Sequence, residues 1–394
     1  MSAYFSLFKH KFITLLLVLF LITSCHSINS NNANNNIDYL YIFYDAGETL
    51  SLLPVIEKME KENLKYKILL LGKGSLNAIE KSNFTKNIIN INKSCSNDFM
   101  IGESTSRENK MNEKILHEVT SCYNPKKVIT GLVSSYQSQI INYYHHTSKV
   151  KLIGFYDGFS LPDLKIITPF NNKLDQILVP SNNIYDFLNE KNIMKDKVKI
   201  VGQPSIDKFI LESKNTDIQK VKKILNIDPD KNIITFIGGY GKEYESVFQD
   251  FVQKSSSIEN SFFIISIHPA VNGKFETDII KKLNLKNFIV IKNEFPTVSL
   301  VTISNLVISQ RSTVGIQSLF INVPSLYFDI ENTSYTNIAI QQGWSPQLLI
   351  NKNNFRNEID KILKKKNTKI LPKNIEEIIP KNSTEHIYSS LLIK

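Results

Sequence analysis

The 394-residue sequence has few cysteines, only three, at positions 25, 95 and 122. None lies in a Cys-x-x-Cys pair, and no cluster of cysteine, histidine or aspartate has a spacing typical of metal ligands. The sequence therefore predicts no metal site. Cys95 and Cys122 leave two interpretations open, a disulfide in an oxidising compartment or two packed or free thiols.

Glycine-rich nucleotide-binding motifs are missing as well. No Gly-Lys-Ser/Thr follows Gly238-Gly239-Tyr240-Gly241 at the Walker A spacing, and the segment lacks the full Gly-x-Gly-x-x-Gly spacing. These absences argue against a P-loop and a nicotinamide cofactor, and we expect no cofactor. Gly238 and Gly239 would still let the backbone approach a ligand closely.

An apolar run near the N-terminus, residues 12–22, is too short for an ordinary transmembrane helix but suits the hydrophobic region of a signal peptide. It ends in Leu21-Ile22-Thr23-Ser24-Cys25, which resembles the bacterial lipobox, whose cysteine receives the lipid. A polar, asparagine-rich run follows at 30–36, as a flexible tether requires. The alternative is a plain N-terminal membrane anchor with a cysteine there by chance.

We therefore predict a lipoprotein, with a signal peptide at 1–24 and a lipidated Cys25 with its tether at 25–37. The expected location is the cell envelope, with membrane attachment through the lipid on Cys25. His26, rather than aspartate, follows the cysteine. By resemblance to lipoprotein sorting rules, this favours the outer membrane in a cell with two membranes.

The net charge is +10, and removal of Lys9 and Lys11 with the signal peptide would leave 10 − 2 = +8. A positive excess suits an anionic ligand or a membrane surface. The lysines are scattered along the chain and no nucleic-acid-binding motif occurs, so we expect no nucleic-acid partner.

Short apolar runs, rich in β-branched residues, alternate with amphipathic segments through the body of the chain. The expected strands are 39–44, 66–71, 87–91, 127–130, 151–156, 176–179 and 198–201, then 233–237, 262–267, 288–292, 305–309 and 324–328. The expected helices include 50–61, 108–120, 135–146, 243–254, 275–283, 313–320 and 353–365. This alternation predicts an α/β fold with two Rossmann-like, doubly wound domains.

The domain boundaries follow from a polar, lysine-rich stretch between the two halves. We expect an N-terminal domain at 38–212, an interdomain linker or helix at 213–231 and a C-terminal domain at 232–373. A last helix is expected at 374–394, where Pro380 must bend or interrupt it.

Ligands of such sheets bind outside the carboxyl ends of the strands, so the loops there are the place to search for chemistry. Asp157 ends one predicted strand before Gly158. Its carboxylate could accept a proton from an attacking hydroxyl, or it could simply cap a turn or helix. His268 ends another strand before Pro269, where an imidazole could donate to a phosphate or serve only a structural role.

A third loop contains Arg311, Ser312 and Thr313 just before a predicted helix. Two hydroxyls, free backbone N–H groups and the positive end of the helix dipole favour an anion there, although N-capping would explain the hydroxyls alone. Asp45 and Glu48 follow the first strand and could lie near an acceptor or cap the next helix.

The order of these motifs resembles glycosyltransferases of the GT-B fold, most closely bacterial sialyltransferases and capsule or lipooligosaccharide enzymes that use CMP-activated sugars. The resemblance covers most of 38–345. Three segments also resemble the sugar 2-epimerase and glycerophosphotransferase branches of that fold: 179–181, 198–207 and 312–317. In those enzymes the segment like 198–207 closes the first domain.

The resemblance implies that Asp157 is the general base, although sialyltransferases often have a second acid where Tyr156 stands. It implies that His268, Ser312 and Thr313 hold the phosphate of the leaving nucleotide, with Arg311 and the glycines near the donor. The expected function is a metal-independent transfer of a sugar, for example sialic acid, from a CMP-linked donor to a surface glycan. Two alternatives are a UDP-sugar 2-epimerase and a non-catalytic exported binding lipoprotein.

Overall fold

The computed structural model describes residues 36–82, 88–89, 111, 113, 116–117, 120, 123–147, 149–268, 271–292, 294–331, 333–364 and 372–392. Cys25, Cys95, Cys122 and Pro269 lie outside these residues, and so do the predicted signal peptide and most of the predicted helix at 108–120. Within the described ranges, none of the helices has both the length and the apolar character needed to span a membrane.

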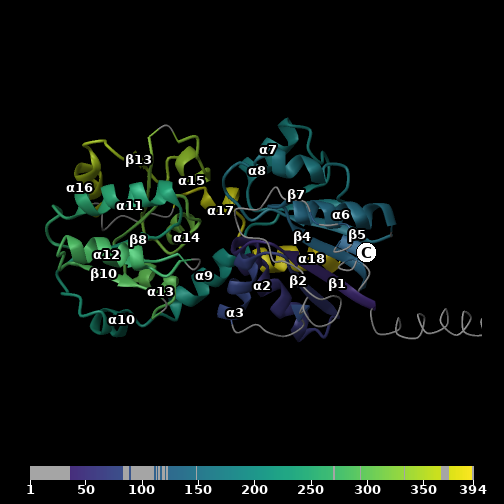
Figure 1. Cartoon of the computed structure of the whole chain (residues 1–394), viewed down its shortest axis with the longest axis horizontal. Coiled ribbons are helices and arrows are strands. Elements are labelled where there is room, and N and C mark those ends of the chain that lie inside the picture. The colour runs from purple at the N-terminus through teal and green to yellow at the C-terminus, as the bar shows by residue number, and fades with distance from the viewer. Residues whose placement is uncertain are drawn as a thin grey trace, which may run out of the picture.

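The first sheet contains seven parallel strands in the order β3-β2-β1-β4-β5-β6-β7 (Figure 1). They are β1 (Asn36–Phe43), β2 (Tyr66–Leu70), β3 (Ile88–Ile89), β4 (Asn124–Gly131), β5 (Lys151–Phe155), β6 (Gln176–Val179) and β7 (Val198–Ile200). The strand order reverses between β1 and β4, because the chain first winds one way from β1 and then crosses back. Residues 36–37, predicted to end the tether, instead begin β1.

The second sheet repeats this winding with six parallel strands in the order β10-β9-β8-β11-β12-β13. They are β8 (Asn232–Ile237), β9 (Ser261–Ser266), β10 (Phe288–Ile291), β11 (Leu306–Ser309), β12 (Ser325–Asp329) and β13 (Gln347–Leu349). The prediction of two doubly wound α/β domains is confirmed. It missed β13, which has only three residues and therefore shows no period.

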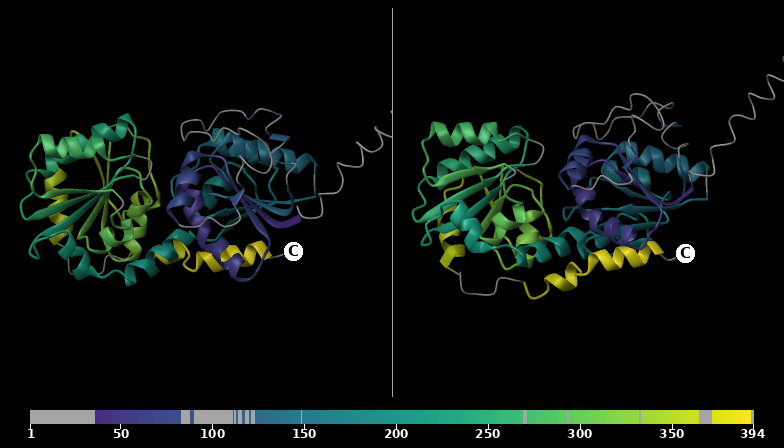
Figure 2. Two further views of the ribbon diagram at one scale, coloured as in Figure 1. Left: turned by 60° about the horizontal axis from the view of Figure 1, so that its bottom comes forward. Right: turned by 90° about the horizontal axis from the view of Figure 1, so that it is seen from below.

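Helices cover both faces of the two sheets, as Figure 2 shows for the C-terminal sheet. In the first half they are α2 (Ala46–Lys61), α3 (Lys73–Lys81), α6 (Ser135–Thr147), α7 (Leu164–Ile167), the 3-10 helix η2 (Thr168–Phe170) and α8 (Asn182–Glu190). Then come α9 (Pro204–Lys214), α10 (Ile218–Ile224), α11 (Lys242–Ser255), α12 (Lys274–Lys282), α13 (Thr297–Thr302), α14 (Val314–Phe320), α15 (Ile338–Gln341), α16 (Phe355–Lys364), α17 (Ile375–Ile378) and α18 (Ser383–Leu392).

Asparagine ends many of these helices. The chain leaves α2, α8, α10, α12 and α14 through asparagines with φ between 50° and 61°, at positions 63, 192, 226, 284 and 322. Asparagine tolerates this left-handed conformation better than other residues with a side chain, and glycine is its usual alternative at such positions. Asparagine therefore ends these helices at positions where glycine is more usual, in a chain that has only 14 glycines.

The helix α9 lies between the two domains and overlaps the start of the predicted linker at 213–231. Pro204 is suited to the first turn of this helix, and Ile206 and Phe209 lie on one face of it. Ile206 packs with apolar side chains of α14 and α15, and Phe209 packs with Ile237 and neighbouring valines of the second domain. The helix α9 therefore contacts both domains, and the boundary at 212 stays a prediction. Figure 1 shows α9 between the two lobes.

The C-terminal segment is two helices instead of one. The break lies at residues 379–382, around Pro380, and the second helix, α18, returns to the N-terminal domain (Figure 2). Ile387, Tyr388 and Leu391 join the core formed by β1 and α2. The carboxylate of Asp207 on α9 accepts hydrogen bonds from backbone N–H groups at the start of α18, so α9 also fixes the returning segment.

A second contact between the domains involves the loop after β5. Phe159 is almost fully buried and packs with Ile316 and Ile338 of the C-terminal domain. The backbone N–H of Ile338 donates to the carbonyl oxygen of Phe159 at 3.3 Å, and Ser160 forms an antiparallel bridge with Asn337. The loop that bears Asp157 is therefore held from the other domain.

Replacing Phe159 with alanine should lower the free energy of unfolding by about 3–5 kcal/mol, because it leaves a cavity between the domains. Urea unfolding measures this loss. Leu161→Ala, two residues along and 40% exposed, is the matched control and should change stability by less than about 1 kcal/mol. Equal effects of the two substitutions would contradict a closely packed domain contact.

Candidate functional site

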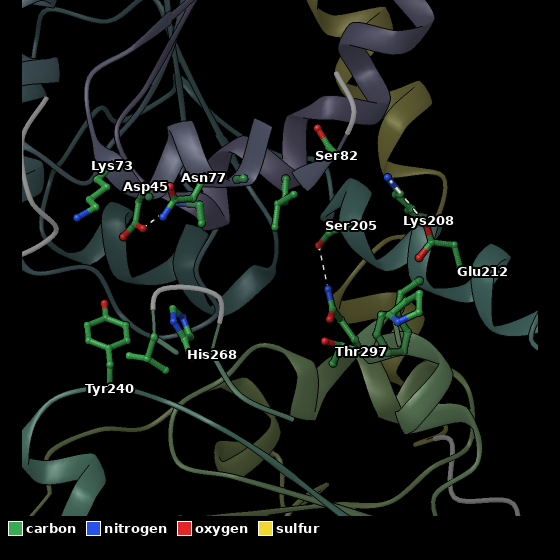
Figure 3. A pocket seen from close by; sticks show the side chains of 18 residues that line it. Asp45, Lys73, Asn77, Ser82, Ser205, Lys208, Glu212, Tyr240, His268 and Thr297 are labelled. Atoms are coloured by element: carbon green, nitrogen blue, oxygen red, sulfur yellow. Dashed lines mark hydrogen bonds and ion pairs between the residues drawn. The ribbon is translucent and has the colours of Figure 1, made fainter. Parts of the chain in front are cut away.

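A cavity of about 570 Å³ lies between the two domains (Figure 3). Its N-terminal side is formed by the starts of α2 and α3 and by one face of α9, and its C-terminal side by loops after β8 and β9 and by α13 and α14. In Figure 3, Asp45, Lys73 and Asn77 lie on one side, and Tyr240 and His268 lie on the other. The cavity is therefore lined by residues that lie far apart in the sequence, such as Asp45 and His268.

Asp45 is the first polar residue after β1 and caps α2. Its Oδ1 accepts a hydrogen bond from the backbone N–H of Ala46 at 2.7 Å, and Glu48 completes a capping box. A Cβ atom on Gly74, at the start of α3, would lie 2.8 Å from the same Oδ1, so only glycine allows this approach. Asp45 thus has the structural role that the sequence left open, and it also lines the cavity.

Glu48 is fully buried beside it. Its Oε1 accepts hydrogen bonds from the backbone N–H groups of Tyr44 and Asp45 and from Nε2 of Gln137 at 2.8 Å. Its buried Oε2 has no hydrogen-bond partner among the residues that the structure describes. Burial raises the pKa of the Glu48 carboxyl well above its usual value, the charge of Asp157 raises it further, and the backbone N–H of Tyr44 opposes the shift. Glu48 does not line the cavity.

Asp157 follows β5 and comes close to the first turn of α2. A Cβ atom on Gly47 would lie 2.3 Å from its Oδ2, so its carboxylate approaches the same helix start as Asp45 and Glu48. Its carbonyl oxygen accepts a hydrogen bond from Nε2 of Gln203 at 2.5 Å. Three carboxyl groups therefore gather where the strand order reverses, near the positive end of the α2 dipole. Asp157 itself stands beside the cavity and is not part of its lining.

Tyr156 does not replace the second acid of the sialyltransferase motif. Its side chain is buried in the core on one face of the sheet, and its hydroxyl donates to the carbonyl oxygen of Ser160 at 2.8 Å. The tyrosine therefore stabilises the turn that positions Asp157.

On the opposite side of the cavity, His268 follows β9 and packs against Tyr240, with 4.7 Å between the ring centroids. Gly238 lies behind them, and its N–H donates to the carbonyl oxygen of Ser266 at 2.7 Å. A Cβ atom on Gly238 would lie 3.0 Å from the backbone nitrogen of His268. Gly238 thus allows close packing behind the histidine, and neither it nor Gly239 lines the cavity.

The predicted anion-binding loop lies outside the lining of the cavity. Arg311 forms ion pairs with Asp329 at 2.8 Å and with Glu243 at 2.9 Å, which connect the loop after β11 with the end of β12 and the start of α11. Oγ of Ser312 accepts a hydrogen bond from the N–H of Val314 at 3.2 Å, and Thr313 makes no such capping bond. The structure thus assigns the arginine to a salt-bridge network, and phosphate binding at Ser312 and Thr313 stays a prediction.

The helix that these residues precede still reaches the cavity. Gln317 of α14 lines it, and its Nε2 donates to Oγ of Ser205 on α9 at 3.1 Å (Figure 3). This hydrogen bond connects α9 with α14 of the C-terminal domain at the wall of the cavity.

Several lining residues were not predicted from the sequence: Lys73, Asn77, Lys208, Tyr240 and Thr297. Lys73 follows the carboxyl end of β2, so a search of every loop after a strand would have found it. Lys208 and Thr297 lie on helices and face the cavity only because α9 crosses between the domains.

The described residues contain no group of three or more histidine, cysteine, aspartate or glutamate side chains arranged to hold a metal ion.

Comparisons with known proteins give a family and a fold. A family model described as CDP-glycerol:poly(glycerophosphate) glycerophosphotransferase matches residues 105–339, more than half of the chain. No curated protein is significantly similar to it in sequence.

Similar solved structures include UDP-GlcNAc 2-epimerase from Neisseria meningitidis bound to UDP-GlcNAc, with TM-score 0.67 and 14% identity over 91% of this chain and 99% of that one. A glycosyltransferase from Rickettsia africae ESF-5 has TM-score 0.60 and 13% identity, again over 91% and 99%. UDP-GlcNAc 2-epimerase from Methanocaldococcus jannaschii, in complex with UDP-GlcNAc and UDP, has TM-score 0.61 and 14% identity over 90% and 99%. These likenesses show a GT-B-like fold.

The buried Glu48 should make stability depend on pH. Its folded-state pKa lies above the ordinary value of 4.5, so the folded protein holds this proton more tightly than the unfolded chain, and stability falls as pH rises through the interval between the two values. Glu48→Gln stays neutral and should lose this decline. Urea unfolding between about pH 5 and pH 8 measures the difference.

Glu57→Gln, at an exposed position of the same helix, is the control and should keep the wild-type dependence. Parallel profiles for wild type and Glu48→Gln would show that the Glu48 carboxyl does not retain its proton in the folded state.

Proposed function

The chain belongs to the CDP-glycerol:poly(glycerophosphate) glycerophosphotransferase family, and on this premise we propose that it transfers a group from a cytidine-nucleotide donor to a hydroxyl of a surface glycan. The observation that carries the proposal is the interdomain cavity, with Asp45 on one side, His268 on the other and Asp157 beside it. A carboxylate and an imidazole on opposite domains can act on the attacking oxygen and on the leaving oxygen of one group transfer.

Both donors that fit the proposal release the same leaving group. In CDP-glycerol the acceptor oxygen attacks the distal phosphorus, and in a CMP-sugar it attacks the anomeric carbon. In each case one bond to the acceptor oxygen forms, the bond to the cytidylate oxygen breaks, and CMP leaves with the electron pair. The family description favours CDP-glycerol, whereas the motif order in the sequence favours a CMP-sugar, including one of sialic acid. A CMP site is common to both.

The residues have distinct proposed roles. Asp157 accepts the proton of the acceptor hydroxyl, and Asp45 binds that acceptor from the first turn of α2. Glu48, buried behind them, holds the loop before α2 in place through Oε1. His268 donates a hydrogen bond to the departing phosphate, and the aromatic ring of Tyr240 packs on its side. The positive net charge of the chain attracts the anionic donor.

A UDP-sugar 2-epimerase is the second candidate, favoured by the fold shared with the two epimerases described above. It would convert UDP-GlcNAc and water into UDP and the free sugar epimer, with no glycan acceptor. Detection of that epimer after incubation with UDP-GlcNAc would decide for it. The third candidate is an exported binding lipoprotein, since a lipid on Cys25 would keep the protein body away from the cytoplasm, where nucleotide-activated donors are made.

Nucleotide binding can be measured by a thermal-shift panel with CMP, CDP, UMP, UDP and GDP. A ligand at about 100 times its Kd stabilises the native state by about 2.7 kcal/mol, which raises the melting temperature measurably. We expect a shift with CMP that His268→Ala removes. His146→Ala, at an exposed position of α6, should keep it. A shift with UDP alone would favour the epimerase, and no shift with any nucleotide would favour the binding protein.

Asp157→Asn should leave the CMP shift intact and lower turnover of CDP-glycerol or CMP-sialic acid by about 10²–10⁴-fold, because the acceptor hydroxyl loses its base. Release of CMP in the presence of a glycan acceptor measures turnover. Asp186→Asn removes the same charge from an exposed position on α8 and should keep full activity. If Asp157→Asn kept full activity, Asp157 would not be the general base, and that role would be assigned to Asp45.

A further inference from the structure

The amino ends of the strands in the N-terminal sheet form a second charged face, at the edge away from the cavity. Lys151, Lys197 and Lys199 line a shallow hollow of about 410 Å³ there, together with Asp175 and Asp196. The sequence scatters these residues over three connections, and the adjacent strands β5, β6 and β7 bring them together.

More lysines lie along the same edge. Lys65 precedes β2, Lys126 and Lys127 lie near the start of β4, and Lys149 and Lys195 precede β5 and β7. The register places Lys127 directly opposite Lys151. Burial lowers the pKa of the Lys127 ammonium, and the positive charge of Lys151 lowers it further. The Lys127 ammonium donates to the carbonyl oxygen of Leu391 and lies over the Tyr39 ring. The charge that can face an anionic partner therefore comes from the exposed lysines of this edge: Lys149, Lys195, Lys197 and Lys199.

Acidic side chains do not neutralise the edge. At the strand starts that the structure describes they are Asp38, Asp175 and Asp196, and Asp38 pairs with Lys126 at 2.7 Å. The ends of the helices that lead into these strands carry both acidic and basic side chains. The lysine excess therefore comes from the strand starts, and we name Lys149, Lys151, Lys195, Lys197 and Lys199 the amino-edge lysine cluster.

The N-terminal segment joins the folded body at the same edge. β1 begins at Asn36, which pairs with Asn124 of β4. Lys126 lies two residues after Asn124 on the same strand. Figure 1 shows this start of β1 at the end of the molecule away from the C-terminal domain. Ten residues, 26–35, separate Cys25 from Asn36, and at about 3.5 Å each they reach at most about 35 Å. An anchor at Cys25 would hold this edge close to the bilayer.

We propose that the amino-edge lysine cluster docks on an anionic phospholipid bilayer, so that the protein stands on the membrane with its C-terminal domain outermost. Basic side chains near an anionic membrane surface are attracted within about one Debye length. The arrival of the anchored segment beside the cluster favours a membrane over a soluble polyanion as the partner. This docking goes beyond the transferase function, and it orients the interdomain cavity toward glycans that lie away from the bilayer.

Lysine acetylation of the full chain on vesicles tests the proposal. One set of vesicles is phosphatidylcholine alone, and the other contains about 30% phosphatidylglycerol. After flotation, N-hydroxysuccinimidyl acetate labels the exposed amines and mass spectrometry reads each site. The cluster should react about fivefold more slowly on the anionic vesicles, and about 0.5 M NaCl should restore its rate.

The control lysines lie on and just after α12 in the other domain and should react equally on both vesicles: Lys274, Lys281, Lys282 and Lys286. Replacing four cluster residues by glutamine should weaken flotation with anionic vesicles of a Cys25→Ser chain about tenfold: Lys149, Lys195, Lys197 and Lys199. The same four changes at the control lysines, with an equal change in net charge, should not.

Equal acetylation of the cluster on the two vesicle types would overturn the docking, even if the chain floats with both. Failure of the full chain to float with either type would overturn docking and anchor together. Protection of the cluster by soluble poly(glycerol phosphate), but not by anionic vesicles, would assign the face to an acceptor polymer. Since none of these outcomes involves CMP or turnover, failure of the docking leaves the proposed transferase function to its own tests.

Discussion

The position of the two domains relative to each other depends on α9, which contacts both of them. Ile206 and Phe209 bury one face of the helix in the C-terminal domain, while the helix also lies against α2 of the N-terminal domain. Phe159 adds a second apolar contact from the loop after β5. Together they hold the carboxyl edges of the two sheets toward each other, and the cavity with its facing carboxylate and imidazole exists only in that arrangement.

The gathering of three carboxyl groups at the start of α2 has an electrostatic cost that the fold offsets in specific ways. The helix dipole and the backbone N–H groups of the first turn favour Asp45, which caps them. Glu48 lies in a site without water contact, where burial favours its neutral form. Gly47 and Gly131 leave the space that Asp157 and Glu48 occupy. A site of this kind costs stability and is typical of positions retained for chemistry.

Much of the fold could be predicted from the sequence. The alternation of β-branched runs with amphipathic segments located twelve of the thirteen strands in the described part of the chain, because buried parallel strands read as continuous apolar runs. The loops after those strands contained Asp45, Asp157 and His268, which lie in or beside the cavity. The prediction was weaker where a helix faces two domains. The lysine-rich stretch after α9 suggested a linker, but the sequence did not show that α9 packs against both domains, because those contacts join residues far apart in the chain.

Local sequence thus determined the strands, the helix caps and the residues at strand ends, because hydrophobic period and capping chemistry act over a few positions. Only the tertiary structure decided which of those residues share a site. In the folded protein Arg311 forms ion pairs with Glu243 and Asp329, and His268 lies across the cavity from Asp45. It also turned scattered lysines into one charged edge, because parallel pairing aligns the starts of strands that are far apart in the chain.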